Sequence, residues 1–136
     1  MGTYDYFDHD ADIGIIGRGK SIEAAFISAA GAMFAIMGTV TCADASETVG
    51  ITFEERDVEL ALVQWLNLLL AEASSRRLLF FGFSLKHEGA EWTGTAKGCH
   101  VSALESRGPE VKGATLTMLS VSHTAVEWEA RCVVDV

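Results

Sequence analysis

Apolar side chains recur every three or four residues in two stretches of the chain, and this spacing predicts two helices. The first covers residues 21–37, where Ser21 can cap the amino-terminal end and Gly38 can end the helix at the C′ position. The second covers residues 58–73, behind Asp57 as its cap. Apolar residues occupy so much of its surface that we expect the second helix to be the more buried one.

Shorter apolar or alternating segments predict β-strands on both sides of these helices. They cover residues 13–16, 49–53, 78–85, 91–101, 114–121 and 126–134. Glu88-Gly89 and residues 122–124 separate the last two pairs of segments as turns do, so we expect two hairpins. Residues 4–7 make a poor strand on their composition. Because hairpins outnumber regular strand–helix–strand units, the sequence predicts an α+β fold in which two main helices pack on a largely antiparallel β-sheet, as a single domain over residues 1–136.

Composition supports one domain with a core of its own. The chain has 136 residues, of which 49% are hydrophobic, so it can bury a core without disulfides or metal ions. Its three cysteines, Cys42, Cys99 and Cys132, lie far apart, and we interpret them as reduced core thiols. With no secretory signal and no apolar run of about 18 residues, the sequence predicts a cytoplasmic protein without a membrane span.

Acidic residues dominate the charge of the chain. Asp and Glu number 19 against 10 Lys and Arg, which gives a formal net charge of −9 at pH 7. Such a surface repels the phosphates of nucleic acids, and the basic residues are too scattered to form a patch. We therefore expect no direct nucleic-acid binding, and we expect a basic protein partner or a hard cation instead.

Three carboxylates at every second position mark the amino-terminal segment. Asp8, Asp10 and Asp12 repel one another unless they are solvated, protonated or shared by a cation. An EF-hand is excluded, because its required glycine falls on Ile13 and its bidentate glutamate falls on Gly19. From these residues alone, a solvated acidic turn and a cation site both remain open.

The other end of the sequence offers further oxygen ligands. A strand over residues 126–134 leads directly into Asp135 and Val136, so the Asp135 side chain and the Val136 main-chain carboxylate lie close together. If this end meets Asp12, three anionic oxygen donors converge, which a Ca²⁺-like ion favours. The simpler alternative is a strand end with one exposed acid.

His9 permits a catalytic interpretation as well. A histidine beside carboxylates can act as a general base, and the alternative is a structural cap. The other histidines lack zinc-ligand spacing, and no nucleophile elbow, P-loop or dinucleotide-binding motif occurs. A small metal-dependent hydrolase that uses His9 and the aspartates is one functional alternative. A chaperone-like interaction module, which needs exposed apolar surface, is another.

The amino-terminal residues resemble the signature of a known family, archease. They comprise the stretch 8–14 (Asp-His-Asp-Ala-Asp-Ile-Gly), Gly17 and the helix start at 21–26 (Ser-Ile-Glu-Ala-Ala-Phe). The likeness continues in residues 111–115 and 133–136, so it covers essentially the whole chain. The signature is the specific part of this resemblance, since the helix and strand patterns alone would not identify a family.

The resemblance implies a non-enzymatic accessory protein that activates an RtcB-type RNA ligase in tRNA splicing, promoting its guanylylation and multiple turnover. It also implies a bound divalent cation, Ca²⁺ with Mg²⁺ as the alternative, held by Asp12, by Asp135 and by Val136 through its main-chain carboxylate. The chain departs from the family pattern at Asp10, where Thr is usual, and at residues 116–118 (Leu-Thr-Met), near which many relatives have a histidine.

Overall fold

The computed structural model of the chain describes residues 2–40 and 46–136. Its elements in chain order are β1 (Thr3–His9), β2 (Asp12–Gly19), α1 (Ile22–Met37), β3 (Gly38–Val40), β4 (Glu47–Glu54), α2 (Val58–Arg76), β5 (Leu78–Glu88), β6 (Glu91–His100), the 3₁₀ turn η1 (Val101–Ala103), β7 (Leu104–Arg107), β8 (Gly113–Ala114), β9 (Ser120–His123) and β10 (Trp128–Asp135).

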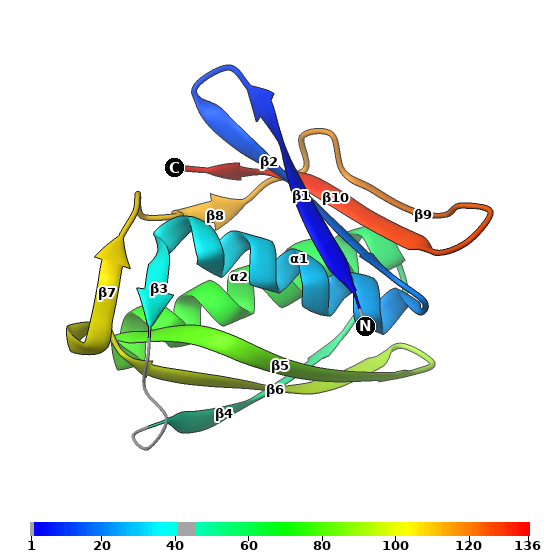
Figure 1. Ribbon diagram of the computed structural model, residues 1–136. Helices are drawn as coiled ribbons and strands as arrows, with labels where there is room; N and C mark the ends of the chain where they lie inside the picture. Colours follow the sequence, from blue (N-terminus) through cyan, green and yellow to red (C-terminus); the bar gives the residue numbers. More distant parts are fainter. Residues whose placement is uncertain (1, 41–45) are drawn as a thin grey trace.

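The two helices lie between two antiparallel sheets, which we call the upper and lower sheets after their places in Figure 1. The upper sheet has the strand order β1-β2-β10-β8, with β9 also paired to β10. The lower sheet has the order β4-β6-β5, and β3 and β7 form a small third sheet. The predicted α+β fold with two helices and antiparallel strands is confirmed, although the strands within residues 2–40 and 46–136 form three sheets.

Both helices begin where the sequence predicts. The hydroxyl of Ser21 accepts a hydrogen bond from the Ala24 amide at 3.1 Å, which caps α1. The Asp57 carboxylate accepts from two amides at the start of α2, at 2.9 and 3.1 Å. This helix continues three residues past the predicted end and stops at Arg77, which takes the left-handed conformation with φ 58°.

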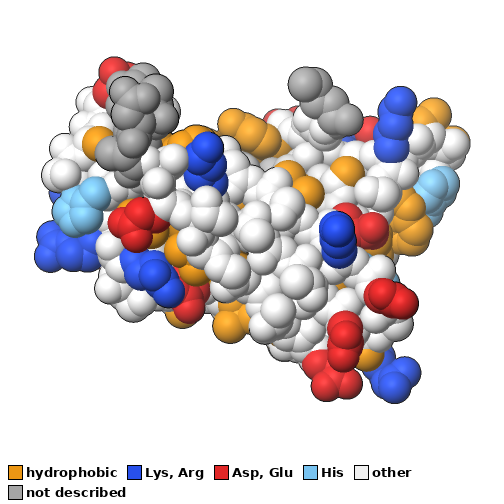
Figure 2. All heavy atoms as spheres, turned by 90° about the horizontal axis from the view of Figure 1, so that it is seen from below, with side chains coloured by type: hydrophobic (Ala, Val, Ile, Leu, Met, Phe, Trp, Pro, Cys, Tyr) orange, Lys and Arg blue, Asp and Glu red, His pale blue; other side chains and the backbone are white. Residues whose placement is uncertain are grey.

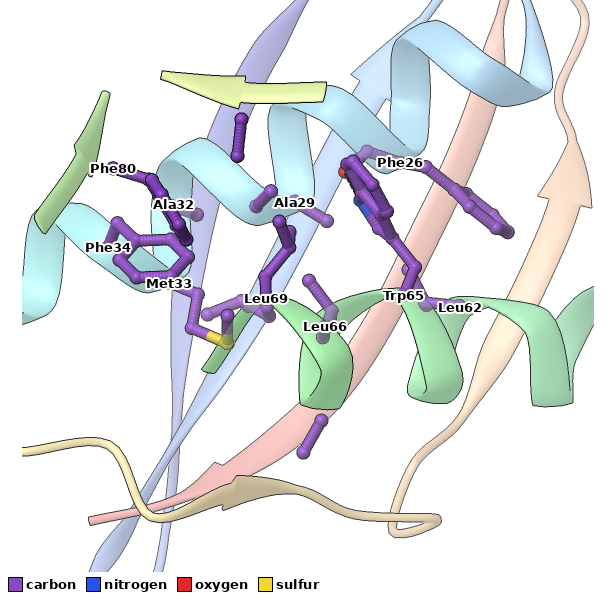
Figure 3. Packing of buried hydrophobic residues seen from close by; sticks show 14 of the residues in the cluster. Phe26, Ala29, Ala32, Met33, Phe34, Leu62, Trp65, Leu66, Leu69 and Phe80 are labelled. Atoms are coloured by element: carbon purple, nitrogen blue, oxygen red, sulfur yellow. Dashed lines mark hydrogen bonds between the residues drawn. The ribbon is translucent and has the colours of Figure 1, made fainter. Parts of the chain in front are cut away.

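The hydrophobic core fills the space between the sheets, with α1 at its centre (Figure 3). Eight of the 16 residues of α1 are buried, against six of the 19 residues of α2, so the expectation that the second helix is more buried is wrong. The reason is position, because α1 lies under the central strands β2 and β10 while α2 lies under the edge strands β8 and β9. The indole of Trp65 on α2 donates a hydrogen bond to the Phe26 carbonyl at 3.0 Å and so ties the two helices together.

Glycine lets α1 approach the upper sheet closely. A Cβ added to Gly17 would lie 2.3 Å from the carbonyl oxygen of Ala25 and 2.3 Å from the amide nitrogen of Ala29. Because both neighbouring atoms belong to the helix backbone, no side-chain movement can relieve that clash. The spacing between β2 and α1 therefore depends on the absence of a side chain at this position.

Two of the predicted strand assignments are wrong. Residues 4–7 do form a strand, because pairing with β2 and packing against the core compensate for a composition that is poor for a strand: the Tyr6 hydroxyl donates to the Ala32 carbonyl at 2.8 Å. The predicted strand 114–121 is broken into β8 and β9 by a loop over residues 115–119, in which Met118 has φ 56°. The final turn accordingly falls at residues 124–127 rather than 122–124.

The cysteines differ from the prediction of three reduced thiols. Cys99 is disulfide-bonded, so the prediction is wrong there. Cys132 is a free and buried thiol, and burial raises its pKa to about 12. Such a thiol stays protonated at neutral pH and is a poor nucleophile. Cys42 lies outside the described residues.

Neither α1 nor α2 combines the length and the apolar character that a membrane-spanning helix needs.

Candidate metal centre

Asp12 lies at the tip of the β1–β2 hairpin. It is the first residue of β2 and pairs across the hairpin with His9, so Asp10 and Ala11 form the turn. Asp10 has φ 52°, a left-handed conformation that aspartate and asparagine adopt more readily than most residues. Local hairpin geometry therefore fixes the position of Asp12 at the end of the upper sheet.

Asp135 and Val136 reach the same end of the sheet through β10. In the β2–β10 register Ile13 pairs with Val134, and continuing that register by one residue places Asp135 opposite Asp12. The Val136 amide donates a hydrogen bond to Asp12 Oδ1 at 3.4 Å. The structure thus brings together the three residues that the resemblance implies as ligands.

The other edge of β10 is also fixed near Asp135. The Lys112 amide donates to the Asp135 carbonyl at 2.7 Å. Asn67 of α2 donates from its side-chain nitrogen to the Ala114 carbonyl at 3.2 Å, and its oxygen accepts from the Ala114 amide at 2.8 Å. The Lys112 bond joins the end of β10 to the segment before β8, and the two Asn67 bonds tie β8 to α2, so this end of the strand is braced on both sides. Sequence reasoning missed Asn67 and Lys112, because only the folded chain brings them to this strand.

The alternation of strand residues puts the acidic groups on the outer face of the upper sheet, away from the helices. Val134 and Ile13 face inward and pack against the core, so Asp135 and Asp12, one residue along each strand, face outward. Asp8 occupies the opposite parity on β1, the parity of Tyr6, which contacts α1. The three aspartates at every second position therefore do not form one cluster, because Asp8 and Asp12 lie on opposite faces of the hairpin.

His9 lies next to this group but has a different environment. Its Nδ1 atom is buried and has no hydrogen-bond partner among the described residues, and it lies 4.0 Å from the Oδ2 atom of Asp10. The Asp10 side chain itself is 93% exposed. His9 is thus positioned beside the acidic residues, and no hydrogen-bond partner of its Nδ1 atom among the described residues would orient it as a general base.

The residues at this end of the sheet could hold a hard cation only if a main-chain group serves as one of the ligands. Within residues 2–40 and 46–136, no three side chains of His, Cys, Asp or Glu come together closely enough to hold a metal ion. A three-ligand site therefore needs the main-chain carboxylate of Val136 in addition to Asp12 and Asp135. All of these donors are oxygens, as Ca²⁺ and Mg²⁺ prefer.

Two hollows in the described part of the chain lie away from these residues. One of about 400 Å³ lies between the end of α2 and residues 107–111, and Arg77 and Arg107 are among its lining residues. The other lies beside the β5–β6 turn, next to His87. The acidic residues instead occupy an open sheet surface, which suits contact with another macromolecule better than enclosure of a small substrate.

The sequence model of the family described as "Archease protein family (MTH1598/TM1083)" matches residues 4–136. This chain belongs to the archease family. Among relatives, it is 30% identical to protein archease of Methanothermobacter thermautotrophicus, with 99% of each chain covered. It is 34% identical to protein archease of Sulfolobus acidocaldarius, with 100% of each chain covered.

Solved structures agree with the archease assignment. The solution structure of Methanobacterium thermoautotrophicum protein 1598 superposes with a TM-score of 0.73 at 26% identity, covering 98% of both chains. The crystal structure of an archease of Thermotoga maritima, described as a possible chaperone, gives a TM-score of 0.67 and covers 96% of this chain and 94% of that one. At 21% identity, the second likeness supports the archease fold alone.

Proposed function

We propose that this archease-family chain is a non-enzymatic accessory protein of the cytoplasm that activates an RtcB-type RNA ligase in tRNA splicing. In this role it promotes guanylylation of the ligase and its multiple turnover, without binding RNA itself. The observation that carries the proposal is the contact between Asp12 and Val136, which brings oxygen donors from both ends of the chain to one end of the upper sheet. Family membership over residues 4–136 supports it.

The proposal includes a divalent cation held by Asp12, Asp135 and the main-chain carboxylate of Val136. Two carboxylates at opposite positions of neighbouring strands repel each other, so a cation between them would stabilise this end of the sheet. When bound, the ion supplies positive charge that can be shared with anionic groups of the partner. Ca²⁺ fits the open surface better than Mg²⁺, because it accepts irregular geometry and a variable number of oxygen ligands.

Activation needs no chemistry by the accessory protein itself. It needs tighter binding to one conformational state of the ligase than to the others, and the braced acidic end of the upper sheet offers a rigid surface for that purpose. A hydrolase acting through His9 has less support, because neither hollow includes His9 or Asp12. A chaperone-like module needs a continuous exposed apolar surface. On the face below the lower sheet, Figure 2 shows hydrophobic side chains only in small separate areas among charged residues of both signs, so that face does not offer such a surface.

The test is multiple-turnover RNA ligation by an RtcB-type ligase, with and without this protein, together with calorimetric titration of Ca²⁺. We expect Asp12→Asn and Asp135→Asn to abolish the stimulation and to weaken Ca²⁺ binding by roughly tenfold or more, since each removes a ligand charge. Adding one glycine after Val136 moves the main-chain carboxylate and should have the same effect.

Asp10→Asn is the matched control. It removes a carboxylate from the same hairpin, and asparagine tolerates the left-handed conformation of position 10. This variant should stimulate the ligase as the unchanged chain does. Full stimulation by both Asp12→Asn and Asp135→Asn would refute the site, and turnover of phosphate esters by the isolated protein would favour the hydrolase instead.

A further inference from the structure

The loop over residues 115–119, between β8 and β9, exposes two large apolar side chains. Leu116 is 64% exposed and Met118 is 53% exposed. Single exposed apolar residues are common on protein surfaces, but two within one five-residue loop form a local apolar projection. In Figure 1 this connection rises above the upper sheet, on the side away from the helices.

Hydrogen bonds to one residue of β10 hold the 115–119 loop in place. The Val133 carbonyl accepts from the Thr115 amide at 3.0 Å and from its hydroxyl at 2.8 Å. The Val133 amide donates to the Thr117 carbonyl at 3.1 Å. Because these bonds fix both Thr115 and Thr117, the backbone presents Leu116 and Met118 outward instead of letting them fold onto the core.

The register of β10 places the 115–119 loop beside the candidate metal centre. Ala114 pairs with Val134, and Ser120 pairs with Arg131, so the five loop residues lie opposite Cys132 and Val133 alone. Asp135, which lies opposite Asp12, is two positions along β10 from Val133. An apolar projection and an acidic group thus share the same end of the same sheet.

We propose that Leu116 and Met118 are the apolar half of a docking surface whose acidic half is Asp12 and Asp135. The surface fits a protein partner that offers a basic or metal-bearing site with a hydrophobic hollow at its side. Under the proposed function, on which this inference rests, that partner is the RNA ligase. A membrane is a poorer fit, because the carboxylates would be repelled by anionic lipid headgroups, and a second copy would bring like charges together at a net charge of −9.

Because the docking surface has an acidic half and an apolar half, we expect each half to make its own contribution to binding. The carboxylates steer the encounter and fix the orientation, while the apolar side chains slow dissociation by being buried in the partner. Burial of two such side chains is expected to tighten binding by roughly 10- to 100-fold, so their removal should weaken it by the same factor without affecting the ion.

The experiment measures ligase binding by biolayer interferometry and Ca²⁺ binding by calorimetry. The test variant is Leu116→Ser with Met118→Ser, and Leu116→Ser alone serves as a milder second variant. Val126→Ser is the matched control, because Val126 is 82% exposed and lies in the turn between β9 and β10, past the opposite end of β10 from Asp135. We expect the double variant to bind the ligase 10- to 100-fold more weakly, with unchanged Ca²⁺ affinity and thermal unfolding. The control should bind as the unchanged chain does.

Equal ligase affinity for the double variant and the unchanged chain would overturn the inference while leaving the proposed function standing. Equal losses for the double variant and Val126→Ser would overturn it too, because the effect would then be unspecific. A self-associated state or vesicle binding that the double variant alone abolishes would assign the apolar pair to another occupant and also overturn it. No binding by the unchanged chain to a cognate ligase would overturn the proposed function, and this inference with it.

Discussion

The inner and outer faces of the upper sheet are built from alternate residues of the same strands, yet they differ in packing and chemistry. The inner face presents small or apolar residues to α1, including Ile15, Gly17 and Ala130, and at Gly17 the helix backbone leaves no room for a side chain. The outer face carries ionised groups, with Glu129 between two arginines and Asp12 at its end. The close packing that stabilises the fold and the charged groups thus lie on opposite faces, so each can be altered without the other.

The outer face nevertheless has a small apolar group of its own. Ile16 and Val133 are buried without belonging to the main core, and the ring of Phe7 lies over Gly14 beside them. The guanidinium of Arg131 lies 5.6 Å from the centre of the Phe7 ring. This group supports the strands that carry the acidic residues, and it is expected to contribute less than the inner face because fewer atoms surround it.

Adjacent isoleucines on β2 give the largest test of this comparison. Ile15 is fully buried on the inner face, and Ile16 is 7% exposed on the outer face. We expect Ile15→Ala to lower the free energy of unfolding by about 4 kcal/mol and Ile16→Ala to lower it by about 2 kcal/mol. Urea titration followed by circular dichroism measures both, and equal losses would show that the two faces contribute alike.

Gly17→Ala tests the close approach of α1 to the inner face. The added methyl group meets backbone atoms of Ala25 and Ala29, so the helix must move, and we expect a loss of about 3 kcal/mol. Gly50→Ala on β4 is the control, because a Cβ there has no neighbouring atom within 4 Å. The control should change stability by no more than about 0.5 kcal/mol. A small effect at both positions would contradict the packing argument.

The ion network of the outer face gives a smaller effect. Glu129 accepts from Arg18 at 3.2 Å and from Arg131 at 2.9 Å, and its side chain is only 19% exposed. We expect Glu129→Gln to cost about 1 kcal/mol, and less in high salt. Glu72→Gln is the matched control: it breaks an exposed pair with Arg76 on α2, which should contribute no more than about 0.5 kcal/mol. Equal costs would mean that burial adds nothing to the network.

At neutral pH the smallest effect on stability comes from the thiol of Cys132 on the inner face, and this effect grows as the pH rises. Burial raises its pKa from the ordinary value of 9.0 to about 12. The unfolded thiol therefore ionises first, so the stability that the neutral thiol contributes is complete below pH 9 and is lost as the pH rises toward 12. Unfolding midpoints should fall less between pH 8 and pH 10 in Cys132→Ala than in the unchanged chain. If the unfolding midpoints of both proteins fell equally over this pH range, the thiol of Cys132 would not be the group responsible.

Local patterns in the sequence predicted the parts of the fold that local forces decide. Both helices follow from their apolar spacing and from the caps Ser21 and Asp57, and the β5–β6 hairpin follows from the turn at Glu88-Gly89. The strand β1 and the break at residues 115–119 could not be predicted, because contacts with distant residues decide them.

Of the residues at the candidate site, some could be identified from the sequence and others could not. Asp12, Asp135 and Val136 were identifiable as oxygen donors, and the structure brings them together as the family resemblance implies. The brace from Asn67 was not identifiable, because Ala114, with which it forms two hydrogen bonds, lies 47 residues away. The metal ion itself stays a prediction, as does the identity of the partner.

The pairing of β2 with β10 also affects the order of events in folding. Asp12 and Val136 are 124 residues apart, so closing this end of the sheet requires a long loop closure, whereas the β5–β6 hairpin closes locally. We expect the oxygen donors to meet only after the rest of the fold has formed. An ion that needs all of these donors would then bind only the native state. By mass action, its binding would shift the equilibrium from late folding intermediates to the native state. Apparent stability should therefore rise with Ca²⁺ concentration, and the unfolding rate should fall.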